Sequence, residues 1–205
     1  NENTMIALDG GDATISSAMT KGKTFKINVD GNMQNVNGIS IKGYHASTFE
    51  LESIRAMGIA IRTISRNIEN NFNIRFYGGY NDEYAQIGFQ TASNDNDNHA
   101  NVIGRNANIG IDNQASYWFY EYVHVWGCDE GVRLRPNTMN VINNYYPDYT
   151  KIALTCNALP SANIKINNIQ SILPRGYYLI GDETNNHIIL NANNVYIPAG
   201  RSEEH

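Results

Sequence analysis

Charged residues are scarce in this chain of 205 residues, and it has no long hydrophobic run. Only 17% of the residues are charged, and the formal net charge is -5. Because Lys and Arg are scattered singly, we expect no nucleic-acid partner. No apolar run approaches membrane-spanning length and no signal peptide is recognisable, so we expect no membrane insertion. The start at Asn1 rather than Met favours a processed product or an excised piece, and residues 200–205 resemble a tail.

Cysteine is also rare. The two cysteines, Cys128 and Cys156, are too few for a disulfide scaffold. We expect two buried free thiols, as in a reducing compartment. A single bridge between them is the alternative.

Asparagine, by contrast, is abundant: the chain has 31, beside 17 Gly and 5 Pro. Asn tolerates the left-handed region and bonds its own backbone, so it favours turns. It is also a poor helix former. This composition predicts a fold that is rich in turns and poor in long helices.

A short pattern recurs along the chain: a small or turn-forming residue, then apolar, any, apolar. Its seven copies are GISI at 38, GIAI at 58, QIGF at 86, NIGI at 108, GVRL at 131, KIAL at 151 and, loosely, GYYL at 176. Intervals of 20 to 28 residues between short strands are typical of a solenoid. We predict one all-β domain over residues 1–205, a parallel β-helix of about seven to eight coils, with 1–24 as a cap or linker. An antiparallel sandwich is the alternative.

In this register the paired apolar residues point inward and glycine turns the corner. Side chains between and after them point outward and form a polar ladder. That ladder is predicted to contain Lys42, Arg62, Gln90, Asp112, Arg135 and Thr155. The longest intervals predict loops that leave the coil, with YGGYNDEY (77–84) as the tip of one, where Asp82 and Glu83 are an acidic candidate.

The stretches VDGNMQNVNGISIKG (29–43) and NIGIDNQASYWFYEYVHVWGCDEGVRL (108–134) resemble the pectate-lyase-like β-helix of bacteriophage tailspikes. The likeness covers roughly residues 25–156. It implies a right-handed, single-stranded β-helix that is trimeric, belongs to a virion, acts outside the host cell, and binds and often cleaves a surface polysaccharide. Known members are usually longer, so the resemblance implies a fragment or a minimal member.

Hydrolysis of a polysaccharide needs two carboxyl groups flanking the glycosidic bond, one protonated and one ionised. Glu121, paired with Asp129 or Glu130, is the predicted acid/base pair. The neighbours predicted to join this site are Asp112, Arg133 and Arg135. In a lyase the two arginines could neutralise a uronate carboxylate. The alternative is that these carboxylates form ordinary surface ion pairs with arginine.

Asp95 and Asp97 in SNDNDNH (93–99) have the ligand chemistry of a Ca²⁺ loop, but an Asn/Asp turn is the better interpretation. We predict no metal and no cofactor.

Sugar binding needs flat aromatic faces beside polar side chains. Two aromatic segments, 116–122 with Trp126 and 143–149, lie about one coil apart, which predicts that they share one flank. Trp118 and Tyr120 are predicted to face the core. The predicted outward, sugar-binding set is Tyr117, Tyr122, His124, Trp126, Tyr145 and Tyr146. Burial in the core or at a trimer interface is the alternative.

Three hypotheses follow. The chain is a tailspike domain that binds and cleaves a bacterial glycan, a β-helix that binds glycan without cleaving it, or a structural shaft segment. We favour glycan recognition, with cleavage left open.

Overall fold

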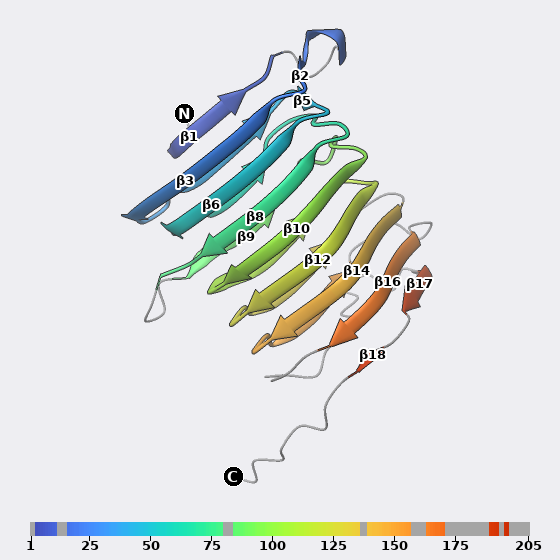
Figure 1. Ribbon diagram of the computed structural model, residues 1–205. Helices are drawn as coiled ribbons and strands as arrows, with labels where there is room; N and C mark the ends of the chain where they lie inside the picture. The colour runs from blue at the N-terminus through green and yellow to red at the C-terminus, as the bar shows by residue number, and fades with distance from the viewer. Residues whose placement is uncertain are drawn as a thin grey trace.

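The computed structural model is an all-β parallel solenoid of about six turns, which we call coils (Figure 1). The structure describes residues 3–11, 16–79, 84–135, 139–156, 163–170, 189–192 and 195–196. All strand pairs among these residues are parallel, so the antiparallel sandwich is excluded and the parallel solenoid is confirmed. The predicted seven to eight coils are too many. The seventh copy of the pattern, at 176, lies outside the described residues, as do Asp82 and Glu83.

Two parallel sheets form the walls of the solenoid. The strands of the first sheet are, in order, β1 (Thr4–Asp9), β4 (Asn37–Lys42), β7 (Ile59–Thr63), β9 (Ala85–Gln90), β11 (Ala107–Asn113), β13 (Glu130–Leu134) and β15 (Ile152–Cys156). The strands of the second sheet are β3 (Thr24–Met33), β6 (Thr48–Ala56), β8 (Asn71–Tyr77), β10 (Asn98–Arg105), β12 (Trp118–Trp126), β14 (Met139–Asp148), β16 (Asn163–Gln170), β17 (Ile189–Ala192) and β18 (Val195–Tyr196). At one corner β2 (Thr20–Lys21) pairs with β5 (Tyr44–His45), and Ser16–Ala18 form a 3-10 turn, η1.

Six of the seven pattern copies form successive strands of the first sheet, as predicted. Strand pairing aligns one apolar column, formed by Ile39, Ile61, Phe89, Ile111, Val132 and Leu154. Each member is at most 1% exposed. In GISI and GVRL the residue in this column is the first apolar residue of the pattern, whereas in the other four copies it is the second. The two positions are two residues apart, so both point to the same side of the strand. The other apolar residues at Ile59, Ile87 and Ile109 are only partly buried, so burial of both positions is not general.

The residue before each member of this column is small. These residues are Gly38, Ala60, Gly88, Gly110, Gly131 and Ala153. A Cβ atom at Gly110 would lie 2.5 Å from the carbonyl oxygen of Gly131 in the next coil. Glycine is therefore required here for close approach of neighbouring coils. The expectation that glycine turns the corner is wrong at Gly38 and Gly131, which lie within strands.

Aromatic rings line the inside of the second sheet. Phe49 stacks on Phe25 and on Phe72, with centroids 5.2 and 4.9 Å apart, and Phe72 also stacks on Trp118 at 5.4 Å. Ala100 pairs with Phe72 in the strand between β8 and β12, and its small side chain leaves room for the indole. The rings thus continue the core from coil to coil.

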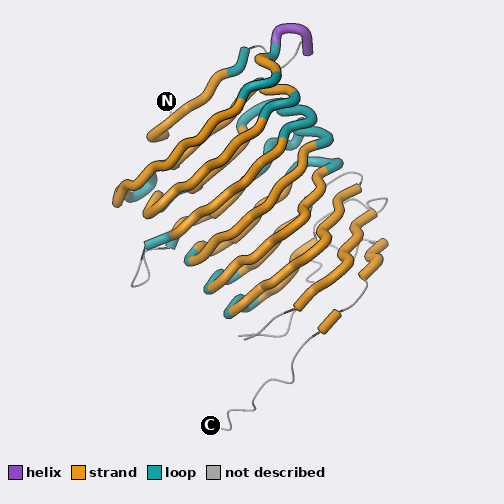
Figure 2. Tube along the Cα trace, viewed as in Figure 1, coloured by secondary structure: helices purple, strands orange, loops and turns teal. Residues whose placement is uncertain are grey.

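Buried asparagines bond the corners that lead from the first sheet into the second. The main-chain N–H of Ser47 donates to Oδ1 of Asn70 at 2.8 Å, and that of Trp118 donates to Oδ1 of Asn140 at 3.0 Å. Both asparagines are fully buried. Figure 2 shows these connections gathered along one edge of the stack. The asparagine content of the chain is therefore explained in part by internal corners as well as by exposed turns.

A β-bulge interrupts the second sheet at Glu121. Ala100 pairs with Tyr120, whereas Asn101 pairs with Tyr122, so Glu121 is an extra residue in β12. Strict alternation cannot bury both Tyr120 and Val123, yet both are 0% exposed. The extra residue reconciles them, because it lets Glu121 and Tyr122 both face outward.

Candidate functional site

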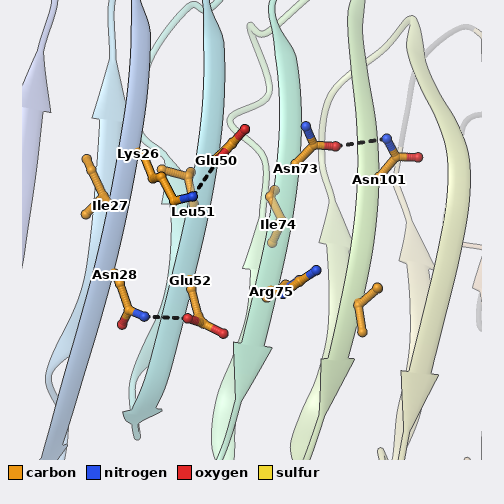
Figure 3. A pocket seen from close by; sticks show the side chains of 11 residues that line it. Lys26, Ile27, Asn28, Glu50, Leu51, Glu52, Asn73, Ile74, Arg75 and Asn101 are labelled. Carbon is orange, nitrogen blue, oxygen red and sulfur yellow. Dashed lines mark hydrogen bonds and ion pairs between the residues drawn. The ribbon is translucent and has the colours of Figure 1, made fainter.

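A shallow hollow of about 400 Å³ lies on the outer face of the second sheet (Figure 3). Strands β3, β6, β8 and β10 form its floor. Its polar lining consists of Lys26, Asn28, Glu50, Glu52, Asn73, Arg75 and Asn101. Ile27, Leu51, Ile74 and Ile103 complete the lining, but Leu51 and Ile74 are core residues that are at most 3% exposed, and Ile27 packs against the core. The surface is therefore mainly polar and suits a ligand with many hydrogen-bonding groups.

Neighbouring strands join the polar side chains of the hollow in pairs. Nζ of Lys26 on β3 lies 3.4 Å from Oε2 of Glu50 on β6. Nδ2 of Asn101 on β10 donates a hydrogen bond to Oδ1 of Asn73 on β8 at 2.9 Å. Glu52 lies two residues after Glu50 on β6, so both carboxylates face the same side. The segments TFKINVDG and FELESI predict strands whose Lys and Glu residues alternate outward. The hollow is not apparent from the sequence, because it depends on the pairing of these two strands.

An aromatic cluster on β12 and β14 lies on the same outer face. The rings of Tyr122 and Tyr146 are 5.4 Å apart, and His124 lies 6.4 Å from Tyr122 and 6.1 Å from Tyr146. Trp126, which is 41% exposed, contacts Tyr149 at 5.4 Å. The two aromatic segments therefore lie side by side on one face of the solenoid, as predicted.

The hollow and the aromatic cluster form one continuous surface, which we call the outer face. Strand pairing sets Asn101 beside Tyr122 and Ile103 beside His124, and both β10 residues line the hollow. Coils repeat at about 4.8 Å, so the outer face presents one row of side chains at each step of this length.

His124 is held by a buried carboxylate. Its Nε2 lies 3.0 Å from Oδ2 of Asp148, and the two side chains are 36% and 8% exposed. Burial raises the pKa of the Tyr122 phenol, and the nearby Tyr146 and Asp148 raise it further. The phenol of Tyr122 therefore keeps its proton at neutral pH.

The predicted acid/base pair is not brought together. Glu121 lies within β12 and accepts a hydrogen bond from Nδ2 of Asn143 at 2.6 Å. Asp129 and Glu130 follow the end of β12 at Trp126, five residues beyond Glu121, or about 16 Å of extended strand. Carboxyl groups that hydrolyse a glycosidic bond together are about 5–10 Å apart. The structure shows no contact between Glu121 and either acid, and the strand length argues against the predicted pair.

Asp129 and Glu130 instead form ion pairs. Oδ1 of Asp129 lies 2.6 Å from Nζ of Lys151, and Oε2 of Glu130 lies 2.5 Å from a guanidinium nitrogen of Arg133. Oε1 of Glu130 also accepts a hydrogen bond from the Thr155 hydroxyl at 3.0 Å. This is the ion-pair alternative that the sequence left open.

The polar ladder of the first sheet differs from the prediction. Strand pairing aligns Ser40, Arg62, Gln90, Asp112, Arg133 and Thr155, so Lys42 and Arg135 are outside the row. Arg62, Asp112 and Thr155 are only 8%, 2% and 4% exposed, so a solvated ladder is wrong for them. Asp112 is shielded from solvent by polar neighbours. Nε of Arg135 lies 3.1 Å from its Oδ1, and Nε2 of Gln90 donates to its Oδ2 at 3.0 Å.

Tyr145 was expected to face outward, and this expectation is wrong. It pairs with Val123, is 0% exposed, and its hydroxyl donates to the carbonyl of Ala153. Burial raises the pKa of Tyr145 well above its ordinary value. Tyr117 is 38% exposed as expected, but it lies at the corner before β12.

Asp95 belongs to an internal turn. Its carboxylate accepts hydrogen bonds from the Thr63 hydroxyl, from the main-chain and side-chain nitrogens of Asn67, and from the N–H of Ala92. Protein donors thus occupy both of its oxygens, which supports the Asn/Asp turn. Among the described residues no group of three or more His, Cys, Asp or Glu side chains could hold a metal ion.

The fold and its outer face define an all-β parallel solenoid with an exposed polar and aromatic wall. Comparison of the chain with family models, curated proteins and solved structures gave no significant match. No helix within the described ranges is long and apolar enough to span a bilayer. The function is therefore inferred from the outer face itself.

Proposed function

We propose that this chain is a tailspike-type β-helix that binds a bacterial surface polysaccharide along its outer face. In this proposal the helix is right-handed, the protein forms a trimer, and it acts outside the host cell on a phage particle. The observation that carries the proposal is the continuity of an exposed aromatic cluster with a polar hollow on a regularly spaced wall.

Each part of the outer face has a role that its chemistry suits. Tyr146 and Trp126 offer flat, apolar faces for the carbon-bound hydrogens of a pyranose ring. The amides of Asn73 and Asn101 and the carboxylate of Glu52 offer donors and acceptors for sugar hydroxyls. Such a combination favours an extended, hydroxyl-rich polymer over a compact ligand.

The direct test is calorimetric titration of the protein with capsule or lipopolysaccharide O-chains from a panel of bacteria. We expect Tyr146→Ala and Trp126→Ala each to weaken binding about tenfold, because each removes a stacking surface worth about 1–1.5 kcal/mol. Ile64→Ala is the control, since Ile64 is 49% exposed and follows β7 of the first sheet. Equal weakening by all three variants, or no binding to any polymer, would refute the proposal.

The structural-shaft alternative predicts a different result. In a shaft the same aromatics would be covered by other chains of the trimer. Light scattering of the Trp126→Ala variant separates the two readings: a glycan-binding face leaves the oligomeric state unchanged, whereas a trimer contact lowers it.

A further inference from the structure

A polar cleft, which we call the corner cleft, lies where the chain passes from the first sheet into the second. It has a volume of about 480 Å³ and is formed by the loop after β7, the loop after β9 and the residues before β12. Its lining is polar throughout and consists of Ser65, Arg66, Ser93, Asn94, Asp95, Asn96 and Ser116. The corner cleft shares no residue with the hollow of the outer face, so it is a separate candidate site.

Arg66 supplies the positive charge of the corner cleft. Its side chain is partly buried, and among the described residues it has no hydrogen bond and no ion pair. Other arginines of the chain are neutralised: carboxylate oxygens lie 2.6, 2.5 and 3.1 Å from guanidinium nitrogens of Arg55, Arg133 and Arg135. A guanidinium that lines a cleft with its paired N–H groups unused favours an oxyanion as ligand.

Uncharged donors surround this guanidinium. Within the described ranges, the hydroxyls of Ser65 and Ser93 and the amide of Asn94 also have no hydrogen-bond partner. Each hydroxyl can donate one hydrogen bond and the amide can donate two. The donors come from two neighbouring loops, so one anion between the loops can accept hydrogen bonds from both coils.

The acid in the lining of the corner cleft does not repel an anion at slightly acidic pH. Asp95 is 2% exposed, and its oxygens accept hydrogen bonds from Thr63, Asn67 and Ala92. Burial raises the pKa of this carboxyl to about 7, although these hydrogen bonds oppose the rise. The carboxyl is therefore mostly protonated at pH 6, and Arg66 determines the charge of the cleft.

A second hollow, of about 350 Å³, adjoins the corner cleft and shares Ser93 and Asn94 with it. This hollow contains Arg62, which is 8% exposed and whose Nε donates to the Ser40 hydroxyl at 2.9 Å. The two hollows together are larger than a free oxyanion needs and have the size of a site for a small molecule.

We propose that the corner cleft binds a small phosphomonoester and that Arg66, Ser65 and Ser93 hold its phosphate group. The adjoining hollow takes the hydroxyl-bearing remainder of the ligand. Phosphate matches the donors better than a carboxylate does, because a phosphate group offers three acceptor oxygens and a carboxylate two. This site goes beyond the proposed function, which assigns polysaccharide binding to the outer face.

Nuclear magnetic resonance titration of the intact, ¹⁵N-labelled protein at pH 6 and constant ionic strength tests the site. The probes are inorganic phosphate, glucose 6-phosphate, glucose and acetate. We expect both phosphate-bearing probes to shift the main-chain amide signals of residues 64–67 and 91–96 in a saturable way. Glucose 6-phosphate should bind more tightly than inorganic phosphate, and glucose and acetate at least about tenfold more weakly than either.

Substitution of Arg66 tests its role. Arg66→Ala should weaken binding of both phosphate-bearing probes about tenfold or more, because it removes charge-assisted hydrogen bonds. Arg66→Lys keeps the charge without the paired donors and should weaken binding less. Lys165→Ala is the matched control, since Lys165 is exposed on β16, has no ion pair among the described residues and carries the same charge. Circular dichroism checks that each variant is folded.

Each other result would overturn a defined part of the inference. Absence of saturable shifts with both phosphate-bearing probes overturns the site, and acetate binding as tightly as phosphate overturns the ligand class. Inorganic phosphate binding as tightly as glucose 6-phosphate overturns the role of the adjoining hollow. Equal weakening by Arg66→Ala and Lys165→Ala would show an effect of net charge alone and overturn the role of Arg66. The polysaccharide titrations with Tyr146→Ala and Trp126→Ala test the outer face independently of these results.

Discussion

The main-chain N–H of Asn70 donates to Oδ1 of Asn98, one coil further along the stack, at 2.9 Å. Asn98 in turn donates from Nδ2 to the carbonyl of Asn67 at 2.9 Å. All three asparagines are fully buried. Side-chain amides thus satisfy main-chain groups at a corner where the strand ladder stops, and an unpaired group there would be costly.

We expect Asn98→Ala to lower the free energy of unfolding by about 1–3 kcal/mol, because it orphans the buried N–H of Asn70. Urea unfolding followed by circular dichroism measures this. Asn73→Ala is the control, since Asn73 is exposed on β8 and should change stability by less than about 0.5 kcal/mol. A loss as large in the control would contradict the corner role.

Asp95 predicts a pH dependence of stability. Burial raises the pKa of its carboxyl from 3.8 to about 7, although bonds from Thr63, Asn67 and Ala92 act in the opposite direction. In the unfolded chain the group ionises near pH 4, so between about pH 4 and 7 only the unfolded state releases the proton. The free energy of unfolding should therefore fall as pH rises through this window. Below about pH 4, where Asp95 is protonated in both states, this loss of stability is absent.

Asp95→Asn removes this titration while keeping the shape of the side chain. Between about pH 4 and 7 we expect the melting temperature of the variant to fall less than that of the original protein, because the variant has no ionisable group at this position. Thermal melts at closely spaced pH values check this. An identical decline in both proteins would assign the pH dependence to other groups.

Gly110 tests the close approach of coils. A Cβ atom there would lie 2.5 Å from the oxygen of Gly131 and 3.0 Å from a methyl group of Val125. We expect Gly110→Ala to destabilise the protein by about 1–3 kcal/mol through overpacking. Asn108→Ala, at an exposed position of the same strand, is the matched substitution and should be nearly neutral. Denaturant midpoints distinguish the two.

The two thiols should be inert in the folded protein. Cys128 and Cys156 are free and buried, as predicted, and burial raises the pKa of Cys128 to about 12. Because the thiolate is the reactive form, a thiol-specific chromogenic reagent should label neither cysteine at neutral pH until the protein unfolds. Rapid labelling of the native protein would contradict this burial.

Much of the fold could be predicted because the apolar pattern reports directly on strand pairing. Ile39 and Ile61 carry the repeat in sequence and also pair in the structure. The sequence does not show which apolar position of each copy enters the buried column. A displacement by two residues preserves the alternation, so the alignment of Ile61 with Phe89 could not be inferred from the glycine positions. Strand pairing between coils resolves it.

The site was predicted in part. Tyr122 and Tyr146 could be placed together because their segments are one coil apart. Tyr145 could not be placed, because β14 breaks the alternation at Asn143 and Asn144, in step with the bulge of β12, and such a break has no firm signature in sequence. The pairing of Glu121 with Asp129 is not supported, because the rest of β12, about 16 Å of extended strand, lies between Glu121 and the corner at Asp129.

The extra residue at Glu121 also gives the outer wall a direction. Strands β14 and β16 follow β12 without another shift, and the row that begins at Glu121 continues through Asn143 to Asn167 by hydrogen bonds of 2.6 Å. Among the described residues, β6, β8 and β10 pair without such an extra residue, and the outward hydrogen bond from Asn101 to Asn73 belongs to the neighbouring row, that of Tyr122. A polymer lying across the coils would thus meet unlike surfaces at its reducing and non-reducing ends, so the two orientations of one polysaccharide would differ in energy.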